Sequence, residues 1–173
     1  MMAEAALPWL LLAQAVMGGL DTLVNHEWLA RLAHRPSARR ELALHSVREA
    51  SYGTLFIGLA LFEWHGSGAW VIAAVLVLEA LVTATDEFVE NRTRVLPQNE
   101  RVMHVFLTIN YGVIVAALAP LLLEWVQAAS GLQPRTWGWR SYALAAFGVS
   151  SFAWSLRDLL AWRRLARGAP ASA

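Results

Sequence analysis

Cysteine and lysine are both absent from this chain. Without cysteine, neither a disulfide framework nor a thiolate metal site can form. Also missing are a P-loop, a Gly-rich dinucleotide fingerprint, a Gly-x-Ser-x-Gly elbow and a zinc-protease motif. The basic residues are 14 arginines, and these follow the membrane topology described below instead of forming a basic face. The sequence therefore gives no sign of a nucleotide-dependent enzyme, a serine hydrolase or a nucleic-acid-binding protein.

Apolar residues make up 57% of the chain and gather into long runs, each close to the ~20 residues that a helix needs to cross a bilayer. The runs cover residues 5–24, 44–64, 69–88, 102–123 and 142–162. Many of the nine tryptophans stand at the ends of these runs, as in an aromatic belt. The first run lacks a basic leader and a convincing cleavage site, so we expect it to be retained. The sequence thus predicts an all-α membrane protein with five transmembrane helices in one domain, residues 1–173.

The arginines are distributed unevenly between the two sides of this five-span arrangement. Twelve of the 14 flank the first and third loops or follow the fifth run, and only Arg135 and Arg140 fall on the other side. Arginine-rich loops stay in the cytoplasm. We therefore expect a multi-pass protein of a bacterial-type inner (plasma) membrane, with its N-terminus outside and its C-terminus in the cytoplasm.

The first four runs contain an internal duplication. The pattern Glu-x3-His-x6-Tyr-Gly occurs twice, as Glu41, His45, Tyr52 and Gly53 and again as Glu100, His104, Tyr111 and Gly112. Upstream, Gln14, Asp21 and Asn25 share their spacing with Glu79, Asp86 and Glu90. Both copies run in the same direction, so a pseudo-twofold axis along the membrane normal is expected. The duplication predicts a four-helix bundle from two hairpins, residues 5–66 and 68–126. A structural fifth helix at 140–164 and a flexible tail at 165–173 complete the chain.

Each of these four runs carries a single polar stripe. The spacings are those of one helix face, with intervals of three, four and seven residues. An ionisable group facing lipid costs at least about 2.5–3.5 kcal/mol at the bilayer centre. The stripes are therefore expected to turn into the bundle and meet there. The duplicated ionisable positions on them are Asp21, Glu41, His45, Asp86, Glu100 and His104.

This set of four carboxylates and two imidazoles resembles the ligands of ferritin-like di-iron carboxylate proteins. The stretch Asn99–His104 is also similar to the Asn-Glu-Arg-Met-His stretch of the alternative oxidases, with one residue added. The added residue makes the spacing Glu-x3-His in place of Glu-x2-His, but both spacings keep the pair on one helix face. A second departure is that alternative oxidases lie on the membrane, whereas this chain is expected to span it.

The resemblance implies two metal ions, with iron as the first choice and manganese or zinc as alternatives. The six duplicated residues would be the metal ligands. Glu90 is a candidate base or shuttling carboxylate. Tyr52 and Tyr111 are candidate catalytic groups, although a buried tyrosine more often serves packing. His26 and Glu27 are held as further candidates, but His26 breaks the repeat at a span end, so a surface position is expected for it.

The favoured function is a membrane-embedded dimetal oxidoreductase acting on a lipid-soluble substrate such as a quinol, a fatty acyl chain or an isoprenoid. One alternative is a b-type haem electron-transfer protein with His45 and His104 as axial ligands. Others are a metal-dependent lipid hydrolase and a proton-linked carrier that uses Glu79, Asp86 and Glu90. The same charges also fit an ion-pair network in which Glu100 binds Arg94. Membrane lipid is an expected partner, and the redox partner and a homo-oligomeric state stay open.

The arginine distribution makes the topology testable. Reporter fusions placed near Ala38 and at the C-terminus are both expected to give a cytoplasmic signal. A periplasmic signal at either position would overturn the five-span topology, and with it the parallel arrangement of the two repeats.

Overall fold

The computed structural model describes residues 2–168 and is almost entirely helical, which confirms the helical fold class. The five long helices are α1 (Met2–Asp21), α2 (Arg39–Leu61), α3 (Ser67–Thr93), α4 (Gln98–Gln127) and α5 (Trp139–Gly168). A π-helix, Thr22–Ala30, continues α1, and two short 3-10 turns, Leu32–His34 and Pro36–Ala38, lead into α2. Of the expected flexible tail, residues 165–168 belong to the end of α5, and 169–173 lie outside the described residues.

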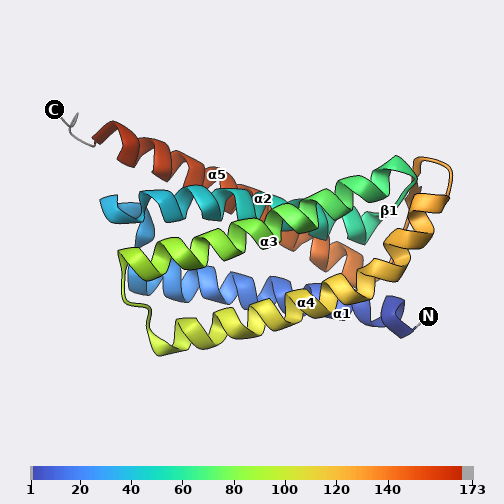
Figure 1. Cartoon of the computed structure of the whole chain (residues 1–173), viewed down its shortest axis with the longest axis horizontal. Helices are drawn as coiled ribbons and strands as arrows, with labels where there is room; N and C mark the ends of the chain where they lie inside the picture. The colour runs from blue at the N-terminus through green and yellow to red at the C-terminus, as the bar shows by residue number, and fades with distance from the viewer. Residues whose placement is uncertain (1, 169–173) are drawn as a thin grey trace.

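The long helices alternate in direction along a common axis (Figure 1). The N-terminus and a short strand pair lie at one end of the molecule. The opposite end, called here the arginine-rich end, carries the α1–α2 and α3–α4 connections and the end of α5. Helix α1 packs against α4, α2 packs against α3, and α5 lies along α2. Each of the first two pairs joins the first helix of one repeat to the second helix of the other.

Three helical segments are long and apolar enough to cross a membrane: Glu4–His34, Ser67–Thr93 and Gln98–Gln127. Helices α3 and α4 also expose many large apolar side chains, among them Val77, Leu81, Phe88, Val105, Phe106 and Ile109. Apolar surface on this scale is rare on a soluble monomer and marks contact with lipid or another partner. Helices α2 and α5 are comparably long but less apolar. The described part of the chain thus contains three candidate spans where the sequence predicts five.

Close packing between α2 and α5 depends on two glycines. A Cβ atom on Gly53 would lie 2.9 Å from the ring of Phe152, and one on Gly148 would lie 2.5 Å from Cγ1 of Ile57. The duplicated Gly112 of α4 has no such neighbour within 4 Å in the described part of the chain. Any larger residue at Gly53 or Gly148 would therefore require the facing side chain, Phe152 or Ile57, or the helix that carries it to shift.

A two-stranded antiparallel sheet at the N-terminal end was not expected from the sequence. It pairs β1 (Phe62–His65) with β2 (Gly131–Pro134). The two copies of Glu-Trp consequently differ, because Glu63 lies in a strand whereas Glu124 lies within α4. Gly66 follows β1 with a φ of 58°, a left-handed conformation that favours glycine. The sheet therefore ends α2 earlier than the second apolar run predicted.

Arg135, which directly follows β2, contacts several elements at this end of the molecule. Its Nη2 lies 3.0 Å from Oε1 of Glu4, and it also forms an ion pair of 2.9 Å with Oε1 of Glu63. Its guanidinium carbon lies 5.5 Å from the ring centre of Trp125 and 5.0 Å from that of Trp137. One arginine thus connects the start of α1, β1, the end of α4 and the segment before α5. Trp125 is buried beneath it, away from the expected aromatic belt.

Replacing Arg135 with glutamine tests this role. We expect a destabilisation of about 1–3 kcal/mol, because the change removes charge-assisted contacts from a largely buried group. Thermal unfolding in detergent, followed by circular dichroism, would measure it. Arg35→Gln, at an exposed position, is the matched control. Equal melting temperatures for the two variants would show that the contacts of Arg135 do not stabilise the fold.

Candidate metal centre

Three imidazoles and five carboxylates come together at the arginine-rich end. They are Asp21, His26, Glu41, His45, Asp86, Glu90, Glu100 and His104, from α1 and its π-helical extension, α2, α3 and α4. Their side chains are 0–4% exposed, except for His104 at 15%. All six ligand candidates taken from the duplication are among them, and so is Glu90. The polar stripes therefore meet inside the molecule.

Two histidine–aspartate pairs cross between the repeats. His45 Nε2 lies 2.9 Å from Asp86 Oδ2, and His104 Nε2 lies 3.4 Å from Asp21 Oδ2. Each pair joins the histidine of one repeat to the aspartate of the other. This exchange of partners is what a pseudo-twofold axis between the repeats would produce.

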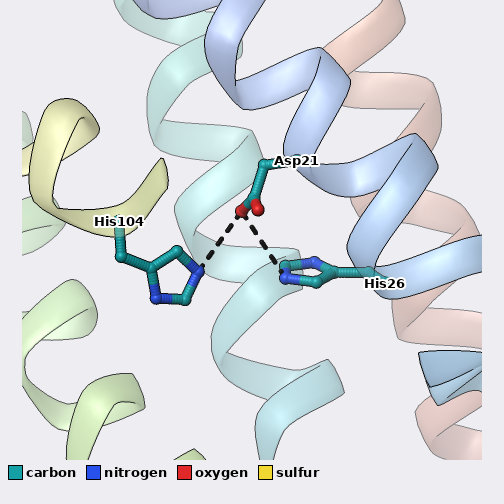
Figure 2. A group of neighbouring side chains, drawn as sticks. All are labelled: Asp21, His26 and His104. Atoms are coloured by element: carbon teal, nitrogen blue, oxygen red, sulfur yellow. Dashed lines mark ion pairs between the residues drawn. The ribbon is translucent and has the colours of Figure 1, made fainter. Parts of the chain in front are cut away.

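His26 is at the centre of this group, so the expected surface position was wrong. Its Nε2 lies 3.6 Å from Asp21 Oδ2 and 3.4 Å from Glu100 Oε1 (Figure 2). In an α-helix, residues five apart point about 140° away from each other. In a π-helix, five residues complete slightly more than one turn, because the hydrogen bonds run from i to i+5. The π-helix Thr22–Ala30 therefore brings His26 under Asp21, where an α-helix would have turned it away.

The three imidazoles are in close contact. The rings of His26 and His45 are stacked with centres 4.5 Å apart, and the His26 and His104 rings meet edge to face at 6.4 Å. The position equivalent to His26 in the second repeat is Asn91, which is exposed and bonds to Glu87. The third imidazole therefore breaks the pseudo-symmetry of the site.

Neighbouring side chains bind the atoms of Asp21 and His104 that point away from the other ligand candidates. Asn25 donates to Asp21 Oδ1 at 2.7 Å and accepts from Asn99 at 2.8 Å, which leaves Oδ2 of Asp21 facing the two imidazoles. Nδ1 of His104 lies 3.1 Å from Glu90 Oε1. A proton on Nδ1 would leave Nε2 with a free lone pair toward Asp21. Carboxylates and amides that fix ligands in this way are typical of metal sites.

The geometry of Asp21, His26 and His104 fits a metal ion. Ligand atoms about 2.0–2.2 Å from a shared ion lie roughly 3–4 Å from one another. Asp21 Oδ2 is 3.4 and 3.6 Å from the two Nε2 atoms, and all three ligand atoms lie within 4.8 Å of one another. Among the described residues, the buried Nε2 atoms of His26 and His104 have no hydrogen-bond partner. Neither do Glu41 Oε2 and Asp86 Oδ1. These atoms are able to accept a cation.

Two arginines, Arg94 and Arg48, also enter the site. Arg94 binds Glu100 through both Nη atoms, at 2.8 and 2.6 Å, and its Nη2 lies 2.8 Å from Glu41 and 3.3 Å from Glu90. Arg48 lies 2.9 Å from Asp86. Burial disfavours the charge on Arg94, but its hydrogen bonds to Glu100 and Glu41 outweigh this and raise its pKa above the ordinary value. The ion pair between Glu100 and Arg94, considered as an alternative, is therefore present.

Tyr52 and Tyr111 lie in a second polar layer. Tyr52 donates to Glu79 at 2.8 Å and accepts from Gln14 at 2.8 Å, while Tyr111 donates to the backbone oxygen of Leu76. In the described part of the chain neither phenol bonds to a ligand candidate. Their catalytic role stays a prediction. Glu79, a buried carboxylate in an apolar segment, accepts hydrogen bonds from Tyr52 and Thr83 at Oε1, while its buried Oε2 has no partner among the described residues.

Helix α5, which was expected to be only structural, carries charged side chains that form ion pairs inside the molecule. Arg157 forms ion pairs with Glu27, at 2.5 Å, and with Asp158, at 2.6 Å. Asp158 is 3% exposed. Glu27, which the sequence left as a reserve candidate, thus points toward α5 and holds the π-helix against it.

Comparison with protein-family models, with curated proteins and with solved structures finds no match for this chain. Fold and site alone therefore define the class: an all-helical protein with candidate membrane spans and residue groups that are able to hold a metal ion.

Arg94 is the counter-ion of three carboxylates, and Arg94→Gln tests this. We expect the metal-free protein to lose about 3–5 kcal/mol of stability, because the buried carboxylates lose their cation. Thermal unfolding after dialysis against chelator measures the loss. Arg163→Gln, an exposed change of equal charge, should leave the melting temperature unaltered. An unchanged melting temperature in Arg94→Gln would show that the carboxylates do not depend on this guanidinium.

Proposed function

We propose that this chain is a five-span protein of a bacterial-type inner membrane that binds two metal ions and oxidises a lipid-soluble substrate. The bundle would consist of the duplicated hairpins plus α5. One observation carries the proposal: five buried carboxylates, two buried imidazoles and the largely buried imidazole of His104 converge from four helices, of which α1, α3 and α4 expose many large apolar side chains. A structure stabilised only by ion pairs has no need for a central imidazole, His26, in contact with two others.

Two groups of residues would hold the metal pair. Asp21, His26 and His104 form the first, a set of two histidines and one carboxylate that suits iron and zinc. His45, whose ring is stacked on that of His26, would begin the second together with Asp86. Carboxylates that bridge or complete both positions would come from Glu41, Glu90 and Glu100. When bound, such an iron pair supplies activation of dioxygen and oxidation of the substrate.

The protein residues exclude water and orient the ligands. Asn25 and Asn99 orient Asp21, and Glu90 orients His104. The role of Glu90 as a base or shuttling carboxylate stays a prediction. His104, at 15% exposed, is the most accessible of the three imidazoles, and it faces the exposed Glu87 at 3.6 Å. A substrate dissolved in the bilayer would therefore approach between α3 and α4. Quinols, fatty acyl chains and isoprenoids all fit an approach from the lipid side.

A metal-dependent lipid hydrolase is the second candidate, because two histidines and one carboxylate also bind catalytic zinc. Metal identity separates the two: iron favours the oxidoreductase and zinc favours the hydrolase. The haem alternative is less favoured, since the His26 ring lies against both His45 and His104. A haem bound by those two residues would have to displace it. The carrier alternative loses support because Glu79 is bonded to Tyr52 and Thr83.

Metal content gives a direct test. Purified protein should contain about two iron ions per chain, and chelation should lower the melting temperature, because cations neutralise the buried carboxylates. His26→Ala should lose metal, whereas His34→Ala, an exposed histidine eight residues away, should retain it. His45→Ala and Glu100→Ala should also lose metal, and Tyr52→Phe should keep it. Elemental analysis, a visible spectrum and thermal unfolding are the measurements.

Two results would count against the dimetal assignment. A sharp Soret band would select haem in its place. An unchanged melting temperature on chelation, together with equal metal content in His26→Ala and His34→Ala, would leave only an ion-pair network.

A further inference from the structure

The outer face of α3 carries a groove at the arginine-rich end. It has a volume of about 300 Å³ and is lined by Leu81, Ala84, Phe88 and Val89, with Arg40 and Arg92 at its polar end. Leu81 is 62% exposed and Phe88 is 71% exposed. The ligand candidates Asp86 and Glu90 of α3 are buried, so the groove is separate from the candidate metal centre.

The two arginines of the groove differ from those of the metal centre. Arg48 and Arg94 are held by carboxylates, but Arg40 and Arg92 form no ion pair or side-chain hydrogen bond with any residue that the structure describes. Arg40 lies in the first turn of α2 and Arg92 in the last turn of α3. Two such cations beside an apolar groove are complementary to an amphiphile with an anionic head.

The length of the groove matches one leaflet of a bilayer. Arg92 and Leu81 are eleven residues apart on α3, which corresponds to about 16 Å along the helix. Half of a hydrocarbon core about 30 Å thick is nearly the same length. Further along α3, a shallower groove of about 390 Å³ begins at Leu78 and extends to Trp70. The apolar track therefore continues toward the centre of the bilayer and beyond.

We infer that this groove binds one anionic phospholipid from the leaflet at the arginine-rich end. The phosphate lies between Arg40 and Arg92, since guanidinium groups bind phosphate through paired hydrogen bonds. An acyl chain lies along Leu81 and Phe88, and the small side chain of Ala84 leaves room for it. The lipid stabilises the packing of α3 beside α2 and does not contact the metal ligands. The inference rests on the membrane placement proposed above and not on the metal site.

The test uses purified full-length protein in detergent, titrated with phosphatidylglycerol or phosphatidylcholine and followed by native mass spectrometry and thermal unfolding. Phosphatidylglycerol should bind more tightly and raise the melting temperature. The double variant Arg40→Gln/Arg92→Gln should weaken the binding of phosphatidylglycerol about 30-fold. This corresponds to a loss of roughly tenfold or less for each arginine removed. Arg35→Gln/Arg163→Gln carries the same change in net charge at exposed positions and should bind as the unmodified protein does.

Ala84→Trp supplies a variant that fills the groove without changing charge, and it should also weaken binding. Inorganic phosphate should not raise the melting temperature, because it lacks the acyl chain. Equal affinity for the two lipids, or equal loss in both double variants, would overturn the groove assignment. Failure of the membrane placement is distinguishable, because the chain would then not float with liposomes. Failure of the metal proposal would alter elemental analysis and leave the lipid titration unchanged.

Discussion

The cost of placing charge next to lipid is the constraint on which this structure depends. Helices with apolar outer faces must turn their ionisable groups inward, and a buried charge persists only when it is paired or bound to a cation. The chain meets this condition at one end, where five carboxylates share Arg48, Arg94 and three imidazoles. Glu79, deeper in α3, accepts hydrogen bonds at Oε1 from the neutral hydroxyls of Tyr52 and Thr83 instead. The polar site and the apolar exterior are therefore two consequences of the same constraint.

The duplication accounts for the two histidine–aspartate pairs of the site, and a local change of helix type accounts for the position of the third imidazole, His26. The pairs His45–Asp86 and His104–Asp21 exchange partners between the repeats. His26 has no histidine counterpart, and it reaches the site because α1 continues as a π-helix. Wider π-helical turns are uncommon and often occur at functional sites. The resulting centre is asymmetric, with two imidazoles beside Asp21 and one beside Asp86, so the two proposed metal positions are not equivalent.

Much of the candidate site could be predicted from the sequence, because helical spacing determines which residues share a face. Asp21, His45, Asp86 and His104 were found in this way, together with the helical class. His26 could not, since its inward position depends on the wider turn of a π-helix and the spacing rule assumes 3.6 residues per turn. The sequence suggested Arg94 only as a partner of Glu100, because a single sequence does not show that the α3–α4 connection also brings this arginine to Glu41. The pairing of β1 with β2 likewise joins segments 65 or more residues apart, which local propensity does not encode.

The charge of the site bears on how many cations it holds. With neutral imidazoles, five carboxylates and two guanidinium groups leave three negative charges. One divalent ion would leave a single negative charge, and two would leave a single positive charge. The exposed Glu87, 3.6 Å from His104, is placed to offset the latter. Under the proposed function, Glu87 would neutralise the excess positive charge of a second ion. It lies beside His104, the imidazole that a substrate would reach first in that proposal, so charge balance and substrate approach would involve the same side of α3 and α4.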